Sequence, residues 1–185
     1  MQKKIVVVFH SGYGHTKKQA EAVAKGAQAT LIEISQEGEI TEAEWALLDE
    51  ADAIVFGTPT YMGMASWQFK KFADASSKAW FVRAWQDKVF GGFTNSASPV
   101  GDKGATMIQL QTLASQHGGI WVSLGVLPAN TKAATHADAN HLGGSVGLLV
   151  RSPADASVEE VPQGDLDTAK AYGQRVAAIA ARLRG

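Results

Sequence analysis

The segment Lys3–Thr16, with the sequence KKIVVVFHSGYGHT, decides the fold. Its first half, Lys3–Phe9, is a β-branched run that predicts a buried strand. The second half carries Gly12 and Gly14, which suit a tight turn between a strand and a helix. A helix is predicted next, because apolar side chains recur at i, i+3, i+4 and i+7: Ala20, Val23, Ala24 and Ala27.

The same alternation of apolar runs and amphipathic segments continues along the chain. Further strands are predicted at Leu31–Ile34, Asp52–Thr58, Val89–Thr94 and Ile120–Leu124. Helices are predicted after Thr41, after Ser66, before Gly118 and over Tyr172–Leu183. Strands that alternate with helices are typical of a doubly wound parallel sheet. We expect one α/β domain over residues 1–185, in which the long stretch Pro128–Gly147 is a loop and not a linker.

Composition and charge exclude several classes of protein. The 185 residues are 45% hydrophobic and 19% charged, as in one globular domain. The absence of cysteine excludes disulfides, thiolate metal sites and cysteine nucleophiles. The near balance of 17 Lys plus Arg and 18 Asp plus Glu, without a basic stripe, argues against nucleic acid as a ligand. We see neither a signal peptide nor a membrane span, and we expect a cytoplasmic protein.

The loop Ser11–Thr16 is predicted to bind a phosphate group. It lies where the unpaired N–H groups and the positive end of a helix converge. The dinucleotide fingerprint does not fit, because Lys17 stands where a third glycine is needed, and the Walker motif lacks its ending. The hydroxyl groups and backbone N–H groups of this loop could hold a phosphate monoester, as in a mononucleotide cofactor, without a metal. The alternative is that the two glycines only make a tight turn.

Two further loops follow strands and would share the same edge of the sheet. They are Thr58–Gly63 and Asn95–Gly101. In a doubly wound sheet, ligands bind beyond the carboxyl ends of the strands, at the point where the strand order reverses. The three loops would provide a phosphate site, the flat aromatic face of Tyr61, and small residues whose backbone can approach a planar ring. This combination predicts a site with the shape of a flavin.

The tracts HSGYGHT, FGTPTYMG and FTNSASPVG, in this order, resemble those of flavodoxin-like FMN proteins. The similarity is to the WrbA-type NAD(P)H:quinone oxidoreductases and NADPH-dependent FMN reductases, and it runs from Lys4 to about Gly125. It implies a flavodoxin-like, five-stranded parallel sheet of order 2-1-3-4-5 in a three-layer α/β/α sandwich. It also implies FMN as the cofactor, NAD(P)H as the electron donor, a quinone as the acceptor, and a homodimer or homotetramer. The segment Glu37–Glu50 is shorter than in such relatives, where a longer one helps to build tetramers.

The resemblance also implies which residues contact the cofactor and the substrates. The first loop would hold the FMN phosphate and the other two would flank the isoalloxazine, while Tyr13 and Trp80 would contact nicotinamide or quinone. No catalytic acid–base pair is expected, because the flavin supplies the chemistry. No metal site is expected either, because the spacing of His136 and His141 does not place both on one helical face. The expected cofactor-binding residues are Ser11, Gly12, Tyr13, Gly14, His15 and Thr16, then Pro59, Thr60, Tyr61, Met62 and Gly63, then Thr94, Asn95, Ser96, Ala97, Ser98 and Gly101, and finally His117, for which a core position is the alternative.

Three functions are compatible with these features. The leading hypothesis is an FMN-dependent oxidoreductase that passes electrons from NAD(P)H through FMN to a quinone. The alternative is a flavodoxin-type one-electron carrier, although a net charge of −1 provides little electrostatic steering toward basic partners. A third possibility is a regulatory protein in which FMN stabilises a partner-binding surface.

Overall fold

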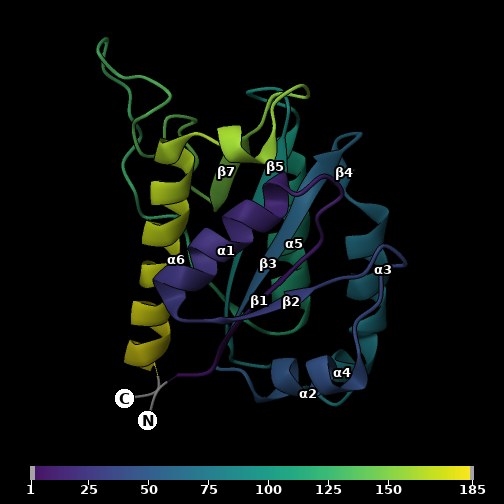
Figure 1. The fold of residues 1–185 in the computed structure, drawn as a ribbon. Coiled ribbons are helices and arrows are strands. Elements are labelled where there is room, and N and C mark those ends of the chain that lie inside the picture. Colours follow the sequence, from purple (N-terminus) through teal and green to yellow (C-terminus); the bar gives the residue numbers. More distant parts are fainter. Residues whose placement is uncertain (1–2, 184–185) are drawn as a thin grey trace.

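The central sheet is parallel and helices cover both of its faces (Figure 1). The computed structural model describes residues 3–183. The main strands are β1 (Ile5–Phe9), β2 (Thr30–Glu33), β3 (Ala53–Tyr61), β5 (Val89–Ser96) and β6 (Ile120–Trp121). They follow the order β2-β1-β3-β5-β6, which corresponds to the predicted order 2-1-3-4-5 because β4 (Met64–Ala65) is a short extra strand. The predicted flavodoxin-like α/β fold is therefore confirmed.

The helices form two layers, one on each face of the sheet. Helices α1 (His15–Ala27) and α6 (Gln163–Leu183) cover one face, and the other is covered by α2 (Glu42–Glu50), α3 (Trp67–Ala75), α4 (Ser77–Phe81) and α5 (Lys103–Gln116). In β1, Val7 faces the first layer and Val8 the second, so that the strand is apolar throughout. None of the helices within residues 3–183 is long and apolar enough to cross a membrane.

The far edge of the sheet differs from the prediction. A continuous fifth strand was expected at Ile120–Leu124, but β6 ends at Trp121 and pairs only with Val89 and Phe90. A second short strand, β7 (Leu148–Arg151), pairs in parallel with the other half of β5, from Phe93 to Ser96. The irregular chain between β6 and β7 contains the predicted long loop. Two short strands, β6 and β7, thus lie one after the other along β5 at the edge of the sheet. Each is followed by its own loop at its carboxyl end.

Strand β3 is longer than predicted and carries a proline near its end. It was expected to stop at Thr58 but runs to Tyr61. Pro59 is tolerated because β1 has already ended: its last residue pairs with Gly57, so no neighbour on that side needs the missing N–H group. Beyond Tyr61 a two-residue turn leads into β4, which pairs antiparallel with β3. This hairpin fixes Tyr61 at the carboxyl edge of the sheet.

Candidate functional site

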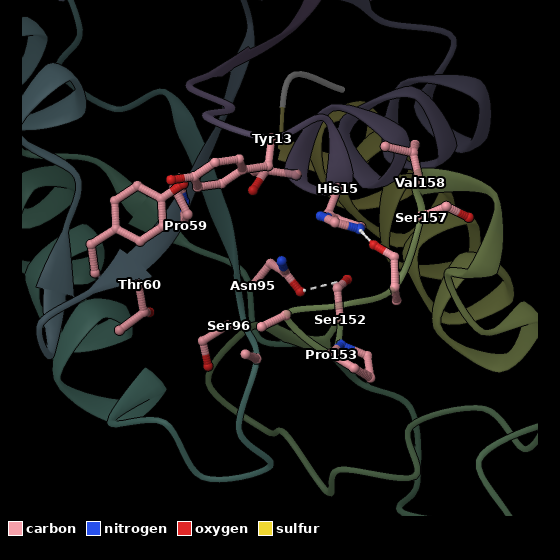
Figure 2. Close-up of a pocket in the computed structure, with 15 residues that line it drawn as sticks. Tyr13, His15, Pro59, Thr60, Asn95, Ser96, Ser152, Pro153, Ser157 and Val158 are labelled. Carbon is pink, nitrogen blue, oxygen red and sulfur yellow. Dashed lines mark hydrogen bonds between the residues drawn. The ribbon is translucent and has the colours of Figure 1, made fainter.

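A cavity of about 670 Å³ opens at the carboxyl edge of the sheet (Figure 2). Its volume lies within the range of roughly 300–1,000 Å³ that is usual for small-molecule sites. Three of its walls come from the loops singled out in the sequence, and a fourth comes from the segment after β7. The described residues that line it include no aspartate or glutamate. They are Tyr13, His15, Thr16, Pro59, Thr60, Tyr61, Asn95, Ser96, Ala97, Ser152, Pro153, Ala154, Ala156, Ser157 and Val158.

The first loop is held by the hydroxyl group of Ser11. Its Oγ accepts hydrogen bonds from the backbone N–H groups of Gly14, at 3.1 Å, and Lys17, at 3.2 Å. Helix α1 begins at His15 with no acidic residue in its first turn, and its N-cap residue, Gly14, has no side chain. The positive end of the helix dipole is therefore not neutralised by the chain itself, and this end of the cavity favours an anionic group.

Two tyrosine rings lie at the rim of the cavity. The ring centroids of Tyr13 and Tyr61 are 6.3 Å apart and the planes meet at 73°, an edge-to-face arrangement. Tyr13 is 78% exposed and Tyr61 is 38% exposed, so both present aromatic surface to a ligand. Partial burial raises the pKa of Tyr61, which keeps its phenol neutral. A Cβ at Gly12 would lie 2.4 Å from the Tyr61 hydroxyl oxygen, so glycine at this position allows the ring to approach the first loop.

Buried hydroxyl groups join the ends of β3 and β5 below the cavity. Thr60 Oγ1 lies 2.7 Å from Thr94 Oγ1 and 2.8 Å from Thr106 Oγ1, which belongs to α5. On the other side, Ser152 Oγ donates to Asn95 Oδ1 at 3.1 Å (Figure 2). These contacts connect the walls that follow β3, β5 and β7, and they reduce the freedom of the backbone around the cavity.

The fourth wall, Ser152–Val158, was missed by the sequence analysis. His15 Nε2 donates to the carbonyl oxygen of Ala156 at 3.0 Å, which fixes this segment to the start of α1 (Figure 2). Val158 packs on Gly14, where an added Cβ would lie 2.7 Å from its Cγ2 atom. The available signal was the apolar run Leu148–Val150, since a strand there would place the following residues at the same edge of the sheet.

The structure brings the predicted residues of the three loops together. Nine of them line the cavity, as given above. The others belong to the same loops or to the adjoining strand ends without lining it: Ser11, Gly12, Gly14, Met62, Gly63, Thr94, Ser98 and Gly101.

His117 and Trp80 lie elsewhere. Helix α5 begins beside the third loop and its 14 residues span about 20 Å, so His117 lies at the opposite end of the sheet. There His117 is buried, with Nε2 2.9 Å from Ser76 Oγ and its ring 4.4 Å from that of Trp85. Burial lowers the pKa of His117 to about 4, so the ring is neutral. Trp80 belongs to α4, which lies at the opposite end of the sheet from β4 and the carboxyl ends of the strands (Figure 1). Within one chain neither residue lines the cavity, and His117 is buried in the core position that was its alternative.

Known proteins resemble the chain over most of its length. Residues 6–134 match the family described as NADPH-dependent FMN reductase. A protein of Pseudomonas aeruginosa named flavodoxin FldP is 64% identical over 97% of this chain and 98% of its own. An NAD(P)H dehydrogenase (quinone) of Archaeoglobus fulgidus is 31% identical over 97% and 98% of the two chains. A crystal structure described as a flavodoxin, WrbA-like protein from Agrobacterium tumefaciens has a TM-score of 0.82 at 54% identity, covering 97% and 98%.

Proposed function

The chain belongs to the family of NADPH-dependent FMN reductases, as its resemblance predicted, and from this membership we propose that its cavity binds FMN and that the protein transfers electrons through it. The observation that carries the proposal is a cavity whose described lining residues include no carboxylate, placed between a helix N-terminus without an acidic residue in its first turn and an aromatic rim. A ligand that is anionic at one end and planar at the other matches this arrangement.

The residues present fit FMN. The phosphate would be held by the first loop, through backbone N–H groups at the start of α1 and the hydroxyl group of Thr16. The isoalloxazine would lie against Tyr61 and the backbone of Asn95–Ala97, where small side chains leave room for a ring. When bound, FMN supplies the electron-transfer chemistry, and the protein supplies binding, orientation and electrostatics.

For the reaction, we propose NAD(P)H as the electron donor and a quinone as the acceptor. The family description supports this, and so do the names of relatives such as the archaeal NAD(P)H dehydrogenase (quinone). The exposed ring of Tyr13 gives a planar donor or acceptor a surface beside the cofactor. We also propose a homo-oligomer, because a nicotinamide contact from Trp80 would require a second chain. We propose the cytoplasm as its compartment.

A one-electron carrier is the second candidate. It is favoured by the relative that is 64% identical and is named a flavodoxin. It requires only the cofactor site, so the position of Trp80 away from the cavity does not count against it.

An anaerobic titration separates the two candidates. Protein loaded with FMN is mixed with NADPH, and separately with NADH, and the flavin absorbance is followed before and after benzoquinone is added. Free FMN at the same concentration is the control. We expect stoichiometric bleaching by at least one nucleotide and recovery with benzoquinone. Flavin that is bleached by dithionite but by neither nucleotide would refute the reductase and favour the carrier.

A further inference from the structure

Lys103 is a buried cation beside the third loop. It is the first residue of α5 and only 1% exposed. Its Nζ donates to the carbonyl oxygen of Pro99 at 3.1 Å and also to that of Ser98. Among residues 3–183, no carboxylate lies within ion-pair distance of this ammonium group. Burial of a charge is costly unless it is paired, and the carbonyl oxygens that hold Lys103 carry only partial negative charge.

Arg151 acts on the same loop from the other side of the sheet edge. It is half-buried at the end of β7, and its Nε donates to the carbonyl oxygen of Ala97 at 3.2 Å. Three successive carbonyl groups, those of residues 97, 98 and 99, are therefore bonded to two cationic side chains. Ala97 itself lines the cavity. The two cations fix the peptide planes of this wall, and their charge lies next to it.

The geometry of the third loop does not by itself explain why a charged side chain, that of Lys103, holds its carbonyl groups. A cation in the first turn of a helix is disfavoured by the helix dipole, whereas a neutral hydrogen-bond donor could hold the same carbonyl groups. Burial lowers the pKa of Lys103 to about 8, so the group is still charged at neutral pH. The charged groups nearby are Asp165, whose pKa burial raises to about 6, and Arg151. At neutral pH Asp165 is ionised and acts on Lys103 from beyond ion-pair distance, so the positive charge persists, and an anion in the cavity would add a second opposite charge near it.

We propose that Lys103, assisted by Arg151, is a positioning residue whose charge makes the cavity bind fully reduced FMN more tightly than oxidised FMN. Reduced FMN carries more negative charge on its ring, and a cation near that ring stabilises it. The inference rests on the proposed function, because it requires FMN in the cavity. It goes beyond that function by assigning the control of the reduction potential to two residues outside the cavity lining.

The test compares Lys103→Met with Lys88→Met in the full-length protein. Lys88 is a matched control: its buried Nζ also donates to backbone carbonyl groups, those of Leu48, Asp49 and Ala51, but it precedes β5 at the end of the sheet away from the cavity. For each variant, the dissociation constants of oxidised FMN and of dithionite-reduced FMN are measured anaerobically, together with the midpoint potential.

We expect Lys103→Met to weaken the binding of reduced FMN about tenfold more than that of oxidised FMN, which lowers the two-electron midpoint potential by about 30 mV. Lys88→Met should change both dissociation constants by less than about twofold. Equal losses for the two forms of FMN in Lys103→Met, or the same result for both variants, would overturn the proposal.

A second variant keeps the proposal testable if Lys103→Met does not fold. Arg151→Met removes the second positive charge, at a half-buried position. We expect it to weaken the binding of reduced FMN about threefold more than that of oxidised FMN. An unchanged ratio of the two dissociation constants would overturn the proposal. A wild-type protein that does not bind FMN would instead refute the proposed function, and this inference with it.

Discussion

Replacement of Asp165 by asparagine should stabilise the protein at alkaline pH. Asp165 lies in the first turn of α6 and is 2% exposed. Its Oδ2 accepts a hydrogen bond from the backbone N–H of Arg151 at 3.3 Å, and its Oδ1 lies 3.3 Å from His141 Nδ1. Burial raises the pKa of Asp165 from 3.8 to about 6. The native state therefore binds the proton more tightly than the unfolded state does.

The sign and size of the effect follow from this shift. A raised carboxyl pKa contributes stability that is present below pH 3.8 and is lost as the pH rises to about 6. A shift of about two pKa units corresponds to about 3 kcal/mol. His141 does not offset this cost, because its own pKa is lowered, mainly by burial. Asparagine carries no charge, so Asp165→Asn should exceed the wild type in stability by up to about 3 kcal/mol at about pH 8.

Urea unfolding followed by tryptophan fluorescence, at about pH 4 and about pH 8, measures this difference. Asp167→Asn is the matched control, because Asp167 lies in the same helix but is exposed and bonds to Gln163. The control should behave as the wild type does at both pH values, and Asp165→Asn should differ only at the higher one. A wild type that is more stable than Asp165→Asn at about pH 8 would contradict this expectation, since it would mean that ionised Asp165 is stabilised by its cationic neighbours.

Two further substitutions test the cavity rim and the core. Gly12→Ala places a methyl group 2.4 Å from the Tyr61 hydroxyl oxygen, so the ring must move. We expect FMN affinity, measured by fluorescence quenching, to fall about tenfold with little loss of stability, and an unchanged affinity would contradict a role for this contact. Tyr172→Phe removes a buried hydroxyl group that donates to Val122 O at 2.8 Å and accepts from Gly92 N at 3.0 Å. Two backbone groups lose their partner, which should cost about 2 kcal/mol in urea unfolding; a loss below about 0.5 kcal/mol would show that water replaces the hydroxyl group.

The parts of the fold that depend on local patterns could be predicted from the sequence. The run Ile5–Phe9 is apolar on both faces because helices pack on both faces of β1, and the pattern shows this directly. The capping box of Thr41 and Glu44 is present, and α5 ends before Gly118, as expected. The three loops meet because the carboxyl ends of parallel strands share one edge of a sheet.

The parts that depend on pairing between distant segments could not be predicted. Nothing in the run Ile120–Leu124 shows that β5 changes partner after Phe90, because hydrogen bonding between strands leaves no local pattern at a sheet edge. The wall at Ser152–Val158 depends on this change and was therefore missed. His117 was assigned to the cofactor by resemblance, but its distance from the cavity is set by the length of α5.

The proposal that the cavity binds FMN is tested by measuring the binding of FMN and of riboflavin to the protein freed of flavin. We predict one FMN per chain and an affinity for riboflavin that is at least about a hundredfold lower, because riboflavin lacks the phosphate group that the first loop and the N-terminus of α1 would hold. Equal affinities for the two flavins, or no binding of FMN, would contradict it.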